Sequence, residues 1–267
     1  DARAHLQLSE GMLKTGGVTR TASKLAFRPD GARLAVGTHE GAVFIFRSDE
    51  AALKTGRLVP LRRGPDDARA RLPLHDCVQK IAELKYSPDS RTLAVASHDQ
   101  FIDLYDAEDD SYKRLYRCRG HSATVSHIDW SVDCKVIMSQ CNAYELLYWD
   151  TDRDCVGWKQ TIGRQLADDQ RDVKWHSWSS TLGFDVLGIW PPDYDNTDIN
   201  MVARSHEVKG YGQYVACATD FGGVLLFNYP AVVKNGPHYW YPGHSSHTKN
   251  IKWLAPIQPT DPAEEPK

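Results

Sequence analysis

Residues 120–150 read GHSATVSHIDWSVDCKVIMSQCNAYELLYWD, and this stretch indicates the fold class. An aliphatic-x-aromatic triplet at residues 128–130 and apolar runs at residues 136–138 and 146–149 are separated by short polar turns and predict three short β-strands. The last run has no polar alternation, which indicates a strand that is covered on both faces. A meander of strands that is stacked between neighbouring sheets is typical of a β-propeller blade.

The same meander recurs along the chain. In three units the closing aromatic residue follows the first aromatic residue by 19 positions. These pairs are Phe27 and Phe46, Tyr86 and Tyr105, and Trp130 and Trp149. Successive units begin 59, 44 and 45 residues apart, and the last two periods match the roughly 40–45 residues of a WD40 blade. Gly120-His121 and Trp149-Asp150 are the two signature dipeptides of that repeat. The sequence therefore predicts an all-β fold, an atypical WD40-type β-propeller of about four blades with incomplete ends.

We expect residues 1–255 to form part of a propeller. The predicted blade units lie near residues 24–47, 80–106, 120–150 and 171–229, with a fifth beginning at 243–255. The aliphatic-x-aromatic triplets at 173–175 and 251–253 are interpreted as strand ends, like those of the first three units. Only 14 residues follow Trp253, so we expect the remainder of the propeller to come from the same polypeptide or a partner chain.

Departures from the period predict insertions near residues 48–76 and 177–215, and a Pro-rich acidic tail covers residues 256–267. The second insertion is expected to be ordered, because burying each of its large apolar side chains contributes about 1.5–3 kcal/mol. Its mostly apolar run at 184–190 predicts an additional or a replaced strand. The polar residues 193–200 are predicted to form a surface loop.

Composition narrows the possible partners. Apolar residues make up 41% of the chain, 32 basic residues face 35 acidic ones, and the net charge is −3. This balance argues against a body that grips nucleic acid or an anionic membrane, and no apolar stretch approaches the ~18–20 residues of a membrane span. The six cysteines include no Cys-x-x-Cys pair, so we expect reduced thiols in a cytoplasmic protein.

Motifs for catalysis fail on spacing. The run Asp150-x-Asp152-x-Asp154 begins like a calcium loop, but Cys155 stands where glycine is needed and Thr161 where a bidentate glutamate is needed. The chain has no Gly-x-Ser-x-Gly elbow and no Gly-Lys-Ser/Thr phosphate loop. We therefore predict that the protein is not an enzyme and has no catalytic, cofactor-binding or metal-binding residues.

Several motifs resemble the second propeller of the echinoderm microtubule-associated-protein-like (EMAP-like) family, from about residue 25 to residue 253. They include residues 120–122, 127–131 and 144–149 of the third unit, and residues 188–191 and 197–200 of an insertion that ordinary WD40 blades lack. The family-like structural residues are Gly120, His121, Trp149, Asp150, Trp190, Pro191, Thr197, Asp198, Asn200, Gly243 and His244.

The resemblance implies a tandem pair of atypical propellers that associates with tubulin, microtubules and other microtubule-bound proteins, without catalysis. The implied locations are the cytoplasm and the cytoskeleton, including the ciliary or flagellar axoneme. A second hypothesis, a general WD40 scaffold with no direct tubulin contact, stays open because a fold does not determine a function.

Two features leave alternatives open. WD40 blades commonly carry an acidic residue six positions before the closing aromatic; Glu40 and Asp99 keep it, but Ala143 and Phe221 replace it. The hydrogen-bond network around His121 is therefore an open question. Trp190 could be a ligand platform or an aromatic plug that closes the insertion onto its own blade.

The first insertion carries an excess of positive charge. Between residues 54 and 71 six basic residues face Asp66 and Asp67, a local charge of +4 in a chain of charge −3. The simplest interpretation is a solvated surface excursion. The alternative is a contact with the acidic surface of tubulin, and the candidate residues are Lys54, Arg57, Arg62, Arg63, Arg69 and Arg71.

Overall fold

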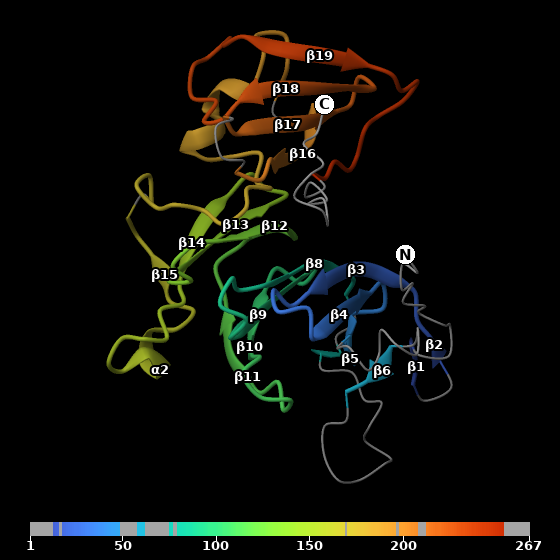
Figure 1. Ribbon diagram of the computed structural model, residues 1–267, viewed down its shortest axis with the longest axis vertical. Coiled ribbons are helices and arrows are strands. Elements are labelled where there is room, and N and C mark those ends of the chain that lie inside the picture. The colour runs from blue at the N-terminus through green and yellow to red at the C-terminus, as the bar shows by residue number, and fades with distance from the viewer. Residues whose placement is uncertain are drawn as a thin grey trace, which may run out of the picture. The chain divides into compact units, whose positions relative to one another are not determined.

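The computed structural model describes residues 13–15, 18–48, 58–61, 75–76, 79–168, 170–195, 198–207 and 212–253 (Figure 1). The chain divides into two compact units, residues 1–180 and 181–267. Besides the strands, the structure contains the one-turn helix α2 (Trp158–Thr161) and the 3-10 helix η3 (Phe184–Ile189). Among the described residues, no helix combines the length and apolar character needed to cross a bilayer.

The first sheet is an antiparallel meander of β3 (Ala22–Phe27), β4 (Arg33–Thr38) and β5 (Ala42–Arg47). The turn between β3 and β4 is closed by two backbone bonds, from the Arg28 amide to the Arg33 carbonyl and from the Gly31 amide to the Arg28 carbonyl. Gly31 has φ 73°, a conformation that glycine adopts without a steric cost. A two-stranded ribbon, β1 (Lys14–Thr15) with β2 (Val18–Thr19), precedes this sheet in the chain.

The second and third sheets repeat this meander and add a fourth strand. The second sheet contains β8 (Ile81–Tyr86), β9 (Thr92–Ser97), β10 (Ile102–Asp106) and β11 (Arg114–Cys118). The third contains β12 (Val125–Trp130), β13 (Val136–Cys141), β14 (Leu146–Asp150) and β15 (Gln165–Leu166). The first strands of consecutive sheets lie side by side, β3 against β8 and β8 against β12.

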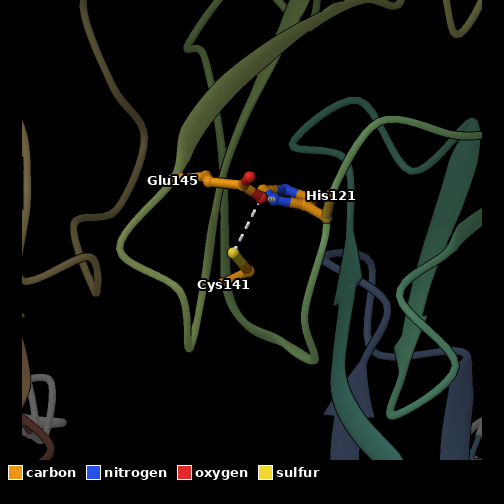
Figure 2. Close-up of side chains that lie close together, drawn as sticks. All are labelled: His121, Cys141 and Glu145. Carbon is orange, nitrogen blue, oxygen red and sulfur yellow. Dashed lines mark hydrogen bonds and ion pairs between the residues drawn. The ribbon is translucent and has the colours of Figure 1, made fainter.

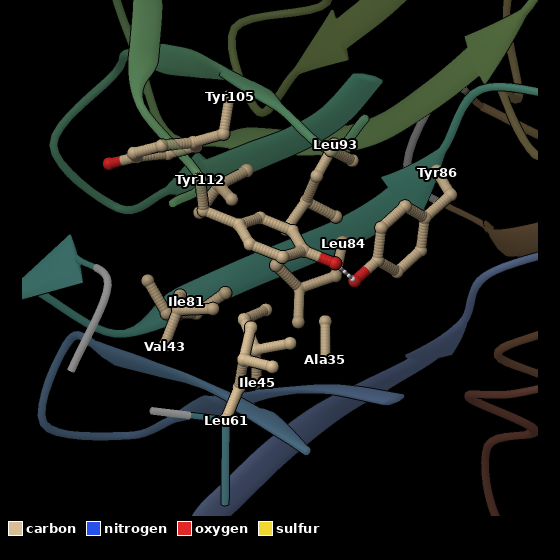
Figure 3. Packing of buried hydrophobic residues seen from close by; sticks show 12 residues of the cluster. Ala35, Val43, Ile45, Leu61, Ile81, Leu84, Tyr86, Leu93, Tyr105 and Tyr112 are labelled. Atoms are coloured by element: carbon tan, nitrogen blue, oxygen red, sulfur yellow. Dashed lines mark hydrogen bonds between the residues drawn. The ribbon is translucent and has the colours of Figure 1, made fainter. Parts of the chain in front are cut away.

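Apolar side chains fill the spaces between consecutive sheets of the first unit. Figure 3 shows the cluster between the first and second sheets, where Val43 and Ile45 meet Ile81 and Leu84. A second cluster, which includes Ile128 and the fully buried Trp130 and Trp149, joins the second and third sheets. Stacking of this kind covers a sheet on both faces, which explains why every residue of β9 is buried. The predicted all-β, WD40-type propeller fold is confirmed.

The first strand of the first sheet has one open face. Ala26 packs against the cluster shared with the second sheet, so the alternating Leu25 and Phe27 point to the opposite side. Leu25 and Phe27 are 56% and 57% exposed, whereas the equivalent Leu84 and Tyr86 are 2% and 7% exposed. Within the described part of the first unit, no sheet covers Leu25 and Phe27 as the first sheet covers their equivalents.

The second unit contains one further antiparallel sheet, and its first strand differs from the prediction. The sheet consists of β16 (Ile199–Arg204), β17 (Tyr214–Thr219), β18 (Gly223–Asn228) and β19 (His238–Pro242). Residues 173–175, predicted as the first strand, form only an isolated bridge from Trp175 to Ser131. The predicted loop at 193–200 is correspondingly shorter, since Ile199 and Asn200 belong to β16. Residues 251–253 also lie outside any strand, and the Trp253 indole donates to the Ala203 carbonyl at 2.7 Å instead.

The apolar run at 184–190 was predicted as a strand and is the 3-10 helix η3. Its burial has a period of three: Val186 and Ile189 are buried, while Phe184 and Leu187 are exposed. This spacing fits 3-10 turns, which are kinked at Val186 (φ −125°, ψ 17°), rather than the alternation of a strand. The Gly188 amide donates to the Ala231 carbonyl at 2.6 Å, so the run packs as a helical turn instead of pairing along its length.

Candidate interaction surface and the His121 cluster

The first insertion interrupts the outermost strand of the first sheet. The strand β6 (Val59–Pro60) pairs with the C-terminal end of β5, and β7 (His75–Asp76) pairs with the N-terminal end of the same strand. The Leu61 amide continues the first pairing by donating to the Ile45 carbonyl at 2.8 Å. The described chain therefore pairs with β5 up to Leu61 and again from His75, at the same edge of the sheet. The six basic candidates, Lys54, Arg57, Arg62, Arg63, Arg69 and Arg71, lie outside the described residues.

Carboxylates neutralise many of the described cations of the first unit. At the strand ends the pairs include Arg28–Asp30 at 2.6 Å, Arg33–Asp110 at 2.8 Å, Arg91–Glu108 at 2.6 Å, Arg91–Asp154 at 2.7 Å, Lys135–Asp152 at 3.0 Å and Arg153–Asp106 at 3.2 Å. The more exposed of these pairs, such as Arg91–Asp154, contribute only about 0–1 kcal/mol each to stability. At these strand ends, the positive charge of the basic side chains is therefore neutralised by nearby carboxylates. The segment 54–71 has a local charge of +4 in the sequence.

The acidic run at Asp150, Asp152 and Asp154 already has partners. Asp152 accepts from Lys135 at 3.0 Å, and Asp154 accepts from Arg91 at 2.7 Å. Asp150 accepts the Asp152 backbone amide at 3.0 Å, which shapes the turn after β14. These contacts agree with an acidic turn at the surface, as the spacing indicates.

His121 is the centre of a buried polar cluster that joins the two signature dipeptides of the third unit. Its ring Nε2 lies 2.7 Å from the Ser139 hydroxyl, and the Trp149 indole donates to the same hydroxyl at 2.7 Å. A Cβ at the preceding Gly120 would lie 2.8 Å from Gln165 Oε1 and 3.1 Å from the Trp149 ring, so a side chain there would require Gln165 to move.

The network around His121 includes an acid that sequence reasoning missed. Glu145 stands four positions before Trp149 rather than six, and its Oε2 lies 3.5 Å from His121 Nδ1. The longer Glu145 side chain reaches the position that Ala143 leaves without a carboxylate. An acidic residue in the same tight turn was the available signal, but the fixed six-residue spacing did not indicate it.

Glu145 is held by further donors. The Ser122 amide and hydroxyl donate to its two oxygens at 2.8 Å each, and the Cys141 thiol donates to Oε2 at 3.2 Å (Figure 2). The Ser122 donors, together with the Cys141 thiol, lower the pKa of Glu145 to about 2. Burial lowers the pKa of His121. At neutral pH the cluster therefore contains a carboxylate beside a neutral imidazole.

A second buried cluster holds residues 177–180 against the third sheet. Asp129 of β12 is fully buried and accepts from Lys85 at 2.6 Å and from the Ser177 hydroxyl at 2.7 Å. It also accepts from the Ser179 amide at 2.8 Å and the Ser180 amide at 3.3 Å. Burial acts to raise the pKa of Asp129, but Lys85 and these donors outweigh it and the pKa is lowered.

The serines at 177–180 were not singled out from the sequence. Lys85 donates to both serine hydroxyls, Ser177 at 3.2 Å and Ser179 at 3.1 Å. Because Lys85 is ion-paired with Asp129, it is not a free base that could activate a serine. The cluster is best explained as the anchor of this segment.

The family-like residues of the second unit lie in and around its sheet. Asn200 of β16 donates to Asp220 at 2.7 Å and to the Thr248 carbonyl at 3.2 Å. Asp198 accepts the Asp195 amide at 2.6 Å.

The other described family-like residues of this unit lie outside the strands of its sheet. The His244 amide donates to the Gly222 carbonyl at 3.0 Å, and Gly243 is exposed. Trp190 is half-buried and followed by Pro191, whose carbonyl accepts the Tyr194 amide, and Thr197 lies outside the described residues. Both interpretations of Trp190 remain hypotheses.

Stacked four-stranded meanders, with a histidine–serine–tryptophan network in the third, define the class as a WD40-type β-propeller. The comparisons then give the family: the family described as echinoderm microtubule-associated protein second beta-propeller matches residues 7–258. The chain belongs to this family, and the resemblance seen in its motifs is confirmed.

The chain is similar to curated members of the same group. It is 36% identical over 235 residues to echinoderm microtubule-associated protein-like 1 of Homo sapiens, and the aligned region covers 87% of this chain and 25% of that protein. It is 38% identical over 229 residues to the human echinoderm microtubule-associated protein-like 4, which covers 85% of this chain and 21% of that protein. The chain thus spans about a quarter of the relatives it matches. A solved structure of RRP9 WD40 repeats has a TM-score of 0.42 and 13% identity, covering 86% of this chain and 54% of that chain.

Proposed function

We propose that this chain is a non-catalytic propeller segment that binds microtubules, tubulin or microtubule-bound proteins through its basic insertion, residues 54–71. Membership of the family supports the kind of partner, because its curated relatives are named as microtubule-associated. The observation that supports the position is the split outer strand of the first sheet, because β6 and β7, which lie within and just after the basic stretch of the sequence, both pair with β5. The predicted locations, cytoplasm, cytoskeleton and axoneme, follow from that partner.

Electrostatics explains why this segment suits an acidic partner. The segment has a charge of +4, whereas many described cations of the first unit are paired with carboxylates. An unmatched positive segment accelerates association with an acidic surface. The attraction is screened over about 8 Å at physiological salt, so binding through it weakens as salt is added.

Charge reversal tests the proposal. In the intact protein, Arg62→Glu with Arg63→Glu should weaken co-pelleting with microtubules by roughly 30-fold at low salt, since two exposed charge contacts are lost and each contributes about 1 kcal/mol at 4 Å in water. The matched control is Lys113→Glu with Lys159→Glu, two exposed lysines of the first unit outside the insertion. The control should pellet like the parent, and the difference between the variants should shrink as salt rises.

Two results would count against the proposal. If both double variants pellet like the parent at every salt concentration, the insertion is only a surface excursion. If the parent protein itself fails to pellet but binds other proteins, the alternative of a general WD40 scaffold without direct tubulin contact is favoured.

We further propose that another blade, from the same polypeptide or a partner chain, covers Leu25 and Phe27. The exposed fractions of 56% and 57%, against 2% and 7% at the equivalent positions of the second sheet, support this proposal. Large apolar side chains at such positions are normally buried between sheets, as the clusters of the first unit illustrate.

A further inference from the structure

We propose that His121, Cys141 and Glu145 form a zinc site at one end of the third sheet. His121 precedes β12, Cys141 ends β13, and Glu145 directly precedes β14 (Figure 2). They are 20 and 4 residues apart and form no recognisable metal motif, which is why the sequence predicts no metal site. The fold of the meander brings them together.

The distances suit a single small cation. One ligand atom from each residue lies within 4.8 Å of the other two. Cys141 Sγ is 3.2 Å from Glu145 Oε2, which is 3.5 Å from His121 Nδ1. A tetrahedral zinc with Zn–S near 2.3 Å and Zn–N or Zn–O near 2.0–2.1 Å separates its ligand atoms by roughly 3.3–3.6 Å. The two separations that involve Glu145 already fit this range, and binding one ion would require Cys141 Sγ and His121 Nδ1 to lie equally close to each other.

The unpartnered imidazole nitrogen is an independent reason to expect a ligand. Nδ1 of His121 is buried and has no hydrogen-bond partner, and its 3.5 Å separation from Glu145 exceeds the 2.7–3.2 Å of an N–H···O bond. The Ser139 hydroxyl accepts from Trp149 and lies 3.4 Å from the Leu147 carbonyl, to which it can donate. When Nε2 donates to Ser139, the Nδ1 lone pair can bind a cation that lies between the ring and the Glu145 carboxylate.

The surroundings resemble a metal site's supporting contacts. Ser139 orients the His121 ring through Nε2, and Ser122 holds both oxygens of Glu145. Such second contacts fix ligands in the orientation that a metal requires. His121 and Cys141 are buried, while the Glu145 side chain is 35% exposed, which provides an entry path and a position for water as fourth ligand. A thiolate with an imidazole and a carboxylate favours zinc over calcium or magnesium.

The other blades show that the thiol is not needed for the fold. Thr38 and Ser97 occupy the position of Cys141, eight residues before the closing aromatic of the first and second units. Both hydroxyl residues end a second strand in the same way. Cys141→Ser is therefore a substitution that the fold itself already uses, and it should remove a zinc ligand without disturbing the turn.

The test is a Zn²⁺ titration of the full chain, reduced and stripped of metal, followed by calorimetry. We expect one equivalent to bind saturably, Cys141→Ser and Glu145→Gln to abolish that equivalent, and Ser122→Ala to weaken it by roughly 10- to 100-fold. The matched control is Cys134→Ser, which removes a half-buried thiol of the same sheet's first turn and should bind as the parent does. Replacing zinc with Co²⁺ should produce a thiolate-to-cobalt charge-transfer band that Cys141→Ser lacks.

Three outcomes would overturn the site: no saturable Zn²⁺ binding, no thiolate-to-cobalt band, or an unchanged equivalent in Cys141→Ser. Circular dichroism of each metal-free variant checks that it is folded. If Cys141→Ser does not fold, Glu145→Gln decides, because it keeps the thiol and the shape of the side chain. Loss of the equivalent in a folded Glu145→Gln supports the site, and its retention refutes it.

Discussion

Asp129 should be one of the most sensitive positions of the first unit. Asp129→Asn keeps the size of the side chain but removes the charge that Lys85 meets at 2.6 Å. It also turns an amide NH₂ towards the Ser177 hydroxyl and the Ser179 and Ser180 amides. These groups donate to Asp129 and are poorly placed to accept a hydrogen bond. Removing one partner of a buried ion pair costs about 3–5 kcal/mol, because the other charge is left without compensation. We expect the free energy of unfolding to fall by that amount.

Urea unfolding followed by tryptophan fluorescence measures this loss. With a slope of about 2 kcal/mol per molar urea, a loss of 3–5 kcal/mol lowers the midpoint by about 1.5–2.5 M. Adding Lys85→Met to Asp129→Asn should recover part of the loss, since the buried charge is then absent. The matched control is Asp110→Asn, which removes a 52% exposed carboxylate from Arg33 and should cost no more than about 1 kcal/mol.

The reasoning fails if Asp129→Asn and Asp110→Asn lower the midpoint equally. It also fails if Lys85→Met adds its full single-variant cost to Asp129→Asn, because coupled partners must not be additive. Either result would mean that the anchor of residues 177–180 lies in apolar packing rather than in the Asp129 cluster.

Two further predictions concern pH and the open face of the first sheet. Burial lowers the pKa of His127 to about 4, so the unfolded chain takes up this proton at a higher pH than the folded chain does. The free energy of unfolding should be unaffected by His127 above about pH 6.5 and should fall by at most about 3 kcal/mol towards pH 4. Urea unfolding at pH 7.5 and 4.5 should show a smaller acid loss of stability for His127→Gln than for the parent, and an equal loss in both would contradict this prediction. Phe27→Ala should lower the free energy of unfolding by less than about 1 kcal/mol when residues 1–267 are alone. The loss should be about 3–5 kcal/mol in the intact protein, where a further blade would cover Phe27. An equally small loss in both proteins would show that this face stays open.

Residue spacing in the sequence predicts some parts of the candidate sites but not others. The excess length between the first two units predicts the insertion at 48–76, and the gap between β6 and β7 falls within it. Gly120-His121 and Trp149-Asp150 indicate the centre of the buried polar cluster. Cys141 and Glu145 could not be found in this way, because a tight turn between β13 and β14 brings them close to His121. No sequence motif predicts that these three residues meet.

What the sequence by itself determined is the set of three consecutive meanders. Strands that pair within a meander are joined by short turns, so apolar runs, turn residues and the 19-residue spacing are all local signals. The strands at 25–27, 84–86 and 128–130 follow from them and are present as the ends of β3, β8 and β12.

Only the tertiary structure decided what happens where the chain leaves that period. Residues 173–175 carry the same aliphatic-x-aromatic pattern, yet Asp129 holds the segment that follows them, and β16 becomes the first strand of the fourth sheet. The pattern indicates an apolar segment, but it does not indicate which strand that segment will pair with. Pairing across an insertion depends on contacts between residues far apart in the chain, such as Asp129 with Ser179, and these exist only after the sheets have packed.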